Sequence, residues 1–326
     1  MKYRTFGRLG WQVSQIGIGT WALGSNWGPQ DDSQSIAALN KALDLGCNFI
    51  DTARAYGNGR SERLIGQVLR ERPREQVYVA SKIPPRLPGD WPPSPYDTLE
   101  ERFPAQHVQA ELEASLRDLQ TDCIDLMQIH TWSRAWNDRP DVFELMARFK
   151  QQGKIRAVGI STPEHDQNAV VDLMRAGLVD SVQVIYNIFD QDAAMQILPL
   201  AAQLGIAIVV RVPFDESALT GKLTSETKFP EGDIRGGYFA GDRLPRTVAR
   251  IDKIRQSIGE KEPNLATAAL KFALKPAAVS VVIPGMRSPE QAAANCAVGE
   301  APPMTDELEH MLRAHYWRRA FWYAGK

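Results

Sequence analysis

The chain has 326 residues, of which 44% are hydrophobic, enough apolar material for one large α/β domain or two smaller ones. Its net charge of −1 gives no electrostatic attraction to nucleic acid or to an anionic membrane. The three cysteines, Cys47, Cys123 and Cys296, form no CxxC pair, which argues against a zinc ribbon or a disulfide framework. The N-terminus lacks an apolar signal segment and no run reaches the ~18 apolar residues of a membrane span, so we expect a cytoplasmic protein.

Short apolar segments alternate with amphipathic ones after an N-terminal pair, 3–6 and 12–14, whose connecting glycines predict a β-hairpin. The predicted strands are 16–20, 48–51, 77–82, 124–130, 157–161, 181–187, 206–212 and 279–283. The predicted helices are one beginning at Ser61 and those at 33–45, 104–119, 141–151, 163–176, 191–204, 247–258, 264–274, 288–297 and 305–316. This alternation predicts an α/β fold, a (β/α)8 TIM barrel over 1–326 as a single domain, with the N-terminal hairpin and an extra C-terminal helix.

Two stretches lack the periodicity. The proline-rich stretch 84–95 is predicted to be an extended loop, because proline fits neither a helix interior nor a central strand. A ligand segment for an SH3-type domain is the alternative for this stretch. The stretch 214–244 is predicted to be a long loop that contains five glycines.

A doubly wound sheet is the alternative fold, and it would need a glycine-rich phosphate turn after an early strand. The strand 16–20 offers only Gly17 and Gly19, with no third glycine at the start of a helix. The segment 217–222, SALTGK, resembles part of a Walker loop, but Glu216 stands where its first glycine would be. Neither phosphate-binding motif is supported.

Polar residues end three neighbouring predicted strands: Asp51, Lys82 and His130. Because the C-terminal ends of parallel strands meet at one rim of a barrel, we expect these side chains to lie together, with Tyr56 on the loop above them. An ordinary ion pair beside a surface tyrosine is the alternative for any of them alone. A cluster of four titratable residues on adjacent strands is typical of a catalytic site.

This cluster has the composition of a proton-transfer site. A tyrosine hydroxyl has a pKa near ~10, which a neighbouring lysine ammonium lowers while an aspartate fixes the lysine. No second histidine or cysteine lies at ligand spacing, so no metal is expected. The cluster therefore predicts protonation of a carbonyl oxygen, with the hydride supplied from elsewhere.

The sequence resembles the aldo-keto reductase superfamily over nearly its whole length. The segments that carry the resemblance are FIDTARAYGNGRSERLIG (49–66), VYVASK (77–82), DLMQIH (125–130), GKIRAVGIST (153–162), LTGK (219–222) and VIPGMRSPEQAAAN (282–295). The resemblance implies a (β/α)8 barrel that binds NADPH without a Rossmann fold and reduces aldehydes and ketones. It implies that Tyr56 is the general acid, that Lys82 and Asp51 tune it, and that His130 orients the substrate carbonyl.

The resemblance also implies which residues hold the nicotinamide. Ser161 and Gln183 resemble the positions that hydrogen-bond its carboxamide. Thr162 stands where the family often has asparagine, so one carboxamide contact is expected to change. Arg211 stands where many members have a tyrosine stacked on the nicotinamide, and it is expected to bind a phosphate or a substrate carboxylate, or to favour the reduced cofactor.

The adenosine end of the cofactor is assigned by the same resemblance to the region after the last strand. Gly285 and Arg287 precede the helix 288–297, whose N-terminus suits a phosphate, and Arg287 is the position expected to bind an adenosine 2′-phosphate. Gln291 and Asn295 lie four residues apart on one helix face and resemble the adenine contacts. The preference for NADPH over NADH therefore depends mainly on Arg287.

Aromatic residues on loops at the catalytic end are expected to form the substrate pocket. These are Trp21 and Trp132, together with residues of the C-terminal tail 317–323, whereas Trp91 is expected to serve loop packing. Aromatic walls would favour a hydrophobic or sugar-ring carbonyl compound. The loop 214–244 is expected to fold over the cofactor pyrophosphate as a lid.

The sequence therefore predicts an NADPH-dependent enzyme that reduces a small-molecule aldehyde or ketone to an alcohol, with no nucleic-acid or membrane partner. An NADPH-binding redox-sensing subunit, similar to potassium-channel β subunits, is one alternative. An NAD-dependent dehydrogenase of a polyol or sugar is the other. The sequence predicts neither the physiological substrate nor the oligomeric state.

Overall fold

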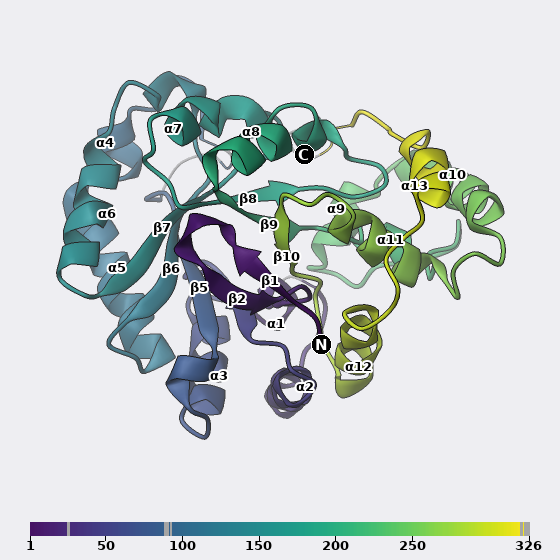
Figure 1. Ribbon diagram of the computed structural model, residues 1–326, viewed down its shortest axis with the longest axis horizontal. Helices are drawn as coiled ribbons and strands as arrows, with labels where there is room; N and C mark the ends of the chain where they lie inside the picture. Colours follow the sequence, from purple (N-terminus) through teal and green to yellow (C-terminus); the bar gives the residue numbers. More distant parts are fainter. Residues whose placement is uncertain (25–26, 88–90, 92, 320–321, 323–326) are drawn as a thin grey trace.

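The computed structural model describes residues 1–24, 27–87, 91, 93–319 and 322. Within these residues, eight parallel strands follow one another in chain order, each hydrogen-bonded to the next (Figure 1). They are β3 (Ile18–Gly19), β4 (Phe49–Asp51), β5 (Tyr78–Ile83), β6 (Ile124–His130), β7 (Ile155–Ser161), β8 (Ser181–Ile185), β9 (Ala207–Arg211) and β10 (Val279–Val282). Parallel bridges from Ile16 to Val282 and from Gly19 to Gly285 join the first strand to the last. The sheet closes on itself, and the predicted (β/α)8 barrel is confirmed.

Helices surround the ring of strands (Figure 1). The α-helices of the described chain are α1 (Trp21–Gly24), α2 (Asp32–Asp44), α3 (Arg60–Leu69), α4 (Leu99–Arg102), α5 (Ala105–Leu119), α6 (Asp141–Gln151), α7 (Val171–Arg175), α8 (Ile197–Leu204), α9 (Ile234–Tyr238), α10 (Arg243–Ile258), α11 (Leu265–Leu274), α12 (Pro289–Val298) and α13 (Asp306–Arg313). Their starts follow from the sequence, since Asp31, Asn264, Ser288 and Thr305 each accept a backbone N–H from the first turn of the helix they precede. No helix within the described part of the chain is long and apolar enough to cross a membrane.

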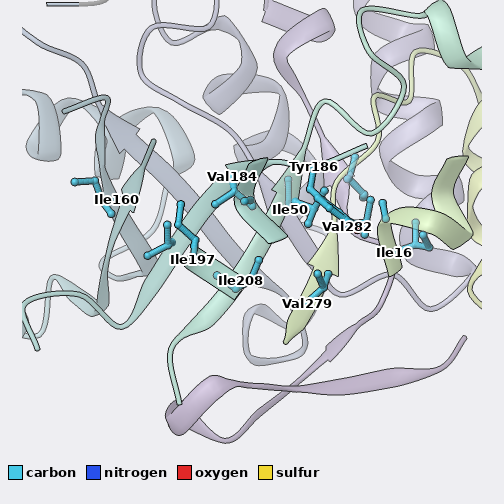
Figure 2. Packing of buried hydrophobic residues seen from close by; sticks show 14 of the residues in the cluster. Ile16, Ile50, Ile160, Val184, Tyr186, Ile197, Ile208, Val279 and Val282 are labelled. Carbon is cyan, nitrogen blue, oxygen red and sulfur yellow. The ribbon is translucent and has the colours of Figure 1, made fainter. Parts of the chain in front are cut away.

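The alternation of side chains along the strands positions the site. Residues such as Ile50, Val184 and Ile208 alternate with the inward ones and belong to the buried cluster shared with the helices, part of which Figure 2 shows. The inward face of β4 carries Phe49 near its start and Asp51 at its end. The strands β5 and β6 repeat this change from an apolar to a polar inward residue, with Ala80 before Lys82 and Leu126 before Gln128. The barrel interior is therefore apolar at one end and polar at the C-terminal rim.

The N-terminal hairpin, β1 (Tyr3–Phe6) and β2 (Trp11–Ser14), covers the apolar end. The Phe6 ring lies 5.4 Å from that of Phe49, and Arg8 N donates to Gly205 O, just before β9, at 2.6 Å. Gly7 has φ of +48°, and a Cβ there would lie 2.6 Å from Ala207 N, so this turn requires glycine. With one mouth covered, the C-terminal rim is the end left for a ligand.

Several predicted elements differ in extent from the observed ones. The first strand is only Ile18–Gly19, and the predicted helix 163–176 is a 3-10 turn, η4 (Gln167–Val170), followed by the short α7. The helix predicted at 247–258 begins at Arg243, because Pro245 lies in its first turn, where no backbone N–H is needed. The helix α4 was not predicted, although Thr98 and Glu101 form a capping box at its start.

Candidate active site

Asp51, at the end of β4, is the point where side chains from three other strands meet. Lys82 Nζ on β5 donates to Asp51 Oδ1 at 2.5 Å. The side-chain amides of Gln128 on β6 and Gln183 on β8 donate to Asp51 Oδ2 at 3.2 and 2.7 Å. All four side chains are buried. Removing a carboxylate from water is costly unless its charge is paired and its oxygens accept hydrogen bonds. These three donors compensate for that cost.

The Lys82 ammonium connects this carboxylate to the tyrosine. Its Nζ also donates to Thr52 O at 2.7 Å and to the hydroxyl oxygen of Tyr56 at 3.3 Å. The Lys82 side chain is 0% exposed, so its three N–H donors all have partners inside the protein. The structure thus brings Asp51, Lys82 and Tyr56 together, as the sequence predicted.

Opposing effects act on the Tyr56 hydroxyl. Burial raises its pKa, the Lys82 ammonium lowers it, and the Asp51 carboxylate raises it again. The net pKa is raised above 10, so the lowering expected from Lys82 is present but is outweighed by burial. The phenol is therefore protonated at neutral pH and can serve as a proton donor.

His130, at the end of β6, completes the predicted cluster. Its ring centroid lies 6.1 Å from that of Tyr56 and 4.7 Å from that of Trp91, edge-on in both cases. Burial, with the charges of Lys82 and Arg211, lowers its pKa well below 6.5, so the imidazole is neutral at pH 7. Its Nδ1 is buried and has no hydrogen-bond partner among the described residues, which leaves it available to a ligand.

The residues at the C-terminal ends of β7 to β9 differ in whether their polar atoms already have partners within the protein. Ser161 is buried at the end of β7, and Thr162 Oγ1 lies 3.1 Å from Gln183 O, so the Thr162 hydroxyl is directed into the protein. Arg211 Nη2 donates to Thr162 O at 2.9 Å and lies 3.4 Å from Glu164 Oε1. Gln183 Oε1 and Arg211 Nε are buried and have no partner in the described part of the chain. These two atoms could bond a ligand at the rim.

The residues after β10 surround the start of α12. Gly285 is exposed, and no atom lies within 4 Å of where a Cβ would be, so its backbone can be approached closely. Gln291 Oε1 accepts from Arg287 N at 2.9 Å, and Asn295 Nδ2 donates to Gly285 O at 3.3 Å. The Ser288 hydroxyl caps the helix. The residues predicted to bind the adenosine end of the cofactor, Gly285, Arg287, Gln291 and Asn295, thus lie side by side and are joined by these hydrogen bonds.

Arg287 also contacts the segment before α2. Its Nε donates to Gln30 Oε1 at 2.7 Å and its Nη2 to Pro29 O at 2.6 Å. Burial and the positive charge of Arg235 lower the pKa of Arg287, whereas the Asp233 carboxylate, which lies 2.6 Å from Arg235 Nη2, raises it. Two guanidinium groups and one carboxylate therefore lie near one another here.

The glycine-rich loop 214–244 extends across this side of the molecule and carries α9. The Arg235 guanidinium lies 4.6 Å from the Trp27 ring, and Arg235 Nη1 donates to Ser217 Oγ at 3.1 Å. Asp215, Glu216 and Ser217 all have positive φ, which directs the start of the loop sharply away from β9. The loop therefore contacts the β3–α2 connection.

The aromatic residues predicted to form the pocket are placed differently from one another. Trp21 lies 6.4 Å from Tyr56 by ring centroids, at the rim. Trp132 is 1% exposed, and its ring packs against Trp136 in the core, because Thr131 before it has φ of +77° and turns the chain away from the rim. Trp91, expected to serve loop packing, instead contacts His130.

The described part of the C-terminal tail packs on the loop 214–244 and on α10. Arg319 pairs with the buried Asp215 and donates to Tyr238 Oη at 2.8 Å. Its guanidinium lies 4.9 Å from the Trp317 ring, and Trp322 is also buried. The rest of the predicted tail, 320–321 and 323, lies outside the described residues.

Several residues of the site were missed from the sequence. Gln128 could have been found, because it precedes His130 by two positions and so shares its face of the strand. Glu164, Gln30 and Arg235 come from loops and gave no periodic signal.

Among the described residues, no group of three or more His, Cys, Asp or Glu side chains could hold a metal ion. The arrangement can donate a proton from the half-buried Tyr56 phenol to a ligand held at the rim.

Comparison with known proteins places these features in a family. Residues 15–316 match the model of the Aldo/keto reductase family. The chain is 32% identical to Aldo-keto reductase YhdN of Bacillus subtilis over 300 residues, covering 89% of this chain and 86% of that protein. It is 28% identical to the NADH-specific methylglyoxal reductase of Escherichia coli over 314 residues, covering 91% and 93% of the two chains.

Solved structures give the same result. The holo form of aldo-keto reductase AKR11C1 from Bacillus halodurans has a TM-score of 0.76 and 27% identity, covering 97% of this chain and 96% of that one. The glycerol dehydrogenase AKR11B4 from Gluconobacter oxydans has a TM-score of 0.78 and 26% identity, covering 96% and 94%. The chain therefore belongs to the aldo/keto reductase family, whose members are oxidoreductases that bind a nicotinamide cofactor.

Proposed function

We propose that the protein is a cytoplasmic NADPH-dependent reductase of small aldehydes or ketones, with Tyr56 as the proton donor. The observation that carries the proposal is the chain of contacts that runs from the buried Asp51 through Lys82 Nζ to the half-buried Tyr56 hydroxyl. A buried ion pair that ends on a phenol at the open rim is costly as a purely structural feature. In a proton-donor site such an ion pair is expected, because it fixes the position of the phenol and the charges around it.

The residues at the rim fit a nicotinamide cofactor, which would supply the hydride when bound. The buried, unpartnered Gln183 Oε1 would accept from a carboxamide NH2, and Ser161 lies on the neighbouring strand. Arg287 and the backbone at Gly285 would hold the adenosine 2′-phosphate, with Gln291 and Asn295 beside the adenine.

The protein's own groups would then act on the carbonyl oxygen. Tyr56, protonated at neutral pH, donates the proton. The neutral His130 ends β6, the strand next to the one that carries Lys82. It can donate one hydrogen bond to the same oxygen and so fix the position of that oxygen. Trp21 and Trp91, which flank these two residues, would form the apolar walls of the pocket.

The decisive test replaces Tyr56 by Phe, which removes only the hydroxyl. Reduction of a generic aldehyde should fall by about 10²–10⁴-fold, the usual contribution of a general acid. NADPH binding, followed by fluorescence titration of the folded protein, should be unchanged within about twofold. Retained turnover would overturn the proposal, and a redox-sensing subunit would show slow turnover already in the wild type.

A second candidate is the reverse reaction, NAD-dependent oxidation of a small polyol. It is favoured by the similarity to a glycerol dehydrogenase and to an NADH-specific reductase. Arg287 favours the phosphorylated cofactor, because a guanidinium forms a charge-assisted pair with a phosphate that it cannot form with the free ribose hydroxyl of NADH. Measuring Kd for NADPH and NADH on the same preparation separates the two candidates.

A further inference from the structure

Two cysteines that are far apart in the sequence touch in the structure. Cys47 lies between the end of α2 and β4, and Cys296 lies on α12. Their sulfur atoms are 3.4 Å apart although 249 positions separate them along the chain. Both are free thiols, each 3% exposed. A contact this short places both sulfurs inside one small buried space.

The two thiols differ in a way that suits them for reaction with each other. The hydrogen bond to Cys296 and burial raise the pKa of Cys47, whereas the bond from Cys47, and the positive charges of the N-terminal ammonium and Lys41, lower the pKa of Cys296. Cys296 is thus the more nucleophilic sulfur at neutral pH, and Cys47 keeps its proton. The pair has one attacking and one resolving thiol.

One member of this pair lies beside the surface, whereas Cys296 is not among the residues that line the same pocket. Cys47 borders a surface pocket of about 230 Å³, whose lining also includes Tyr3, Gly46, Asn48 and Arg72. The pocket lies beside the start of β4, near the apolar end of the barrel, so it is separate from the rim that holds Tyr56. A peroxide entering the pocket would come to the Cys47 side of the pair, and it would have to pass on to the Cys296 sulfur, 3.4 Å from that of Cys47.

We propose that Cys47 and Cys296 form a reversible disulfide when the protein meets a peroxide. The Cys296 thiolate attacks one peroxide oxygen, the O–O bond breaks, and the departing hydroxide takes up a proton to give a sulfenic acid and water. The Cys47 sulfur then attacks the sulfenic sulfur, the S–O bond breaks, and a second water leaves with the Cys47 proton. Two thiols lose two electrons, and one peroxide is reduced to two waters. A dithiol reverses the reaction by exchange.

The bond would fasten α12 to the turn after α2. The sulfurs must approach to about 2.05 Å, which rotation of the two side chains, with a small shift of α12, can supply. At its other end, α12 is already tied to the same region, because Arg287 before it bonds Gln30 before α2. Oxidation would therefore fix α12 at both ends against α2, which lies beside it in Figure 1.

The test counts free thiols before and after oxidation. Reduced wild-type protein, denatured and treated with a maleimide, should take up three labels, and protein pre-treated with hydrogen peroxide should take up one, on Cys123. Tryptic digestion of the oxidised form should give the peptides 42–54 and 288–313 linked by a disulfide that a dithiol cleaves. Non-reducing gels should show only monomer-sized chains, because the bond is intramolecular.

The chain supplies matched controls. In Cys123→Ser the label count should fall from two to none on oxidation, whereas Cys47→Ser should yield no linked peptide. Oxidation should raise the Tm of wild type by about 5 °C, from the loop that the bond closes, and should leave that of Cys47→Ser without this rise. Three labels after oxidation, or a link through Cys123 or between chains, would overturn the proposal. None of these measurements uses NADPH, so they are independent of the proposed catalytic function.

Discussion

Replacing Asp51 by Asn should destabilise the protein strongly, because it leaves the Lys82 ammonium buried without a counter-charge. Removing one partner from a buried pair costs about 3–5 kcal/mol. An unfolding entropy of about 2.1 cal/mol/K per residue gives a chain of this length ~0.7 kcal/mol/K, so Tm should fall by about 4–7 °C. The measurement is thermal unfolding followed by circular dichroism at neutral pH.

The chain contains a matched control for this experiment. Lys275 Nζ lies 2.5 Å from Asp306 Oδ1, the same distance as in the Asp51–Lys82 pair, but the Asp306 side chain is 95% exposed. Water screens such a pair, so Asp306→Asn should leave Tm close to that of the wild type. The double variant Asp51→Asn with Lys82→Met should be more stable than Asp51→Asn alone, since it removes the unpaired charge. Equal Tm values for Asp51→Asn and Asp306→Asn would refute the role assigned to burial.

Three further results are expected. Replacing Arg287 by Ala should raise Kd for NADPH about 10- to 100-fold while changing Kd for NADH less than threefold, because one charged phosphate contact is lost; fluorescence titration with both cofactors checks this. Burial, with the charge of Asp215, raises the pKa of Glu216 from 4.5 to about 8, so the folded state holds a proton that the unfolded state releases. Stability should therefore fall as pH rises from about 4.5 to 8, by up to ~5 kcal/mol, and denaturant titrations of Glu216→Gln should show a flatter pH dependence. Because the pKa of His130 lies well below 6.5 and that of Tyr56 lies above 10, kcat/KM for carbonyl reduction should stay level between about pH 6.5 and 9; an acid limb near 6.5 would contradict the neutral imidazole.

The sequence was most informative where function depends on strand ends. Asp51 and His130 end β4 and β6, and Lys82 is the last residue but one of β5; parallel pairing alone brings such residues to one rim. The apolar alternation of β4 to β6 was visible in the sequence, so both the fold and the centre of the site could be predicted.

The sequence was least informative where a single backbone angle determines which way a side chain points. Thr131 has a left-handed conformation that no pattern announces, and it sends Trp132 into the core rather than to the pocket. The contacts of Arg211 with Glu164 and of Arg235 with Trp27 join loops that are distant along the chain. Loop conformations depend on such long-range packing, which local propensity does not encode.

The balance of effects on Tyr56 could not be predicted either. The sequence indicates that a lysine lies beside the phenol, which lowers its pKa, but it does not indicate how far the site is withdrawn from water. The structure shows that burial is the larger effect.

The convergence of donors from β5, β6 and β8 on Asp51 has a consequence for how the protein is made. A chain that has assembled only its first few strands has not yet brought Gln183 to the carboxylate, so Asp51 Oδ2 then lacks the shorter of its two amide donors. The buried carboxylate is therefore fully compensated only when the ring has formed as far as β8.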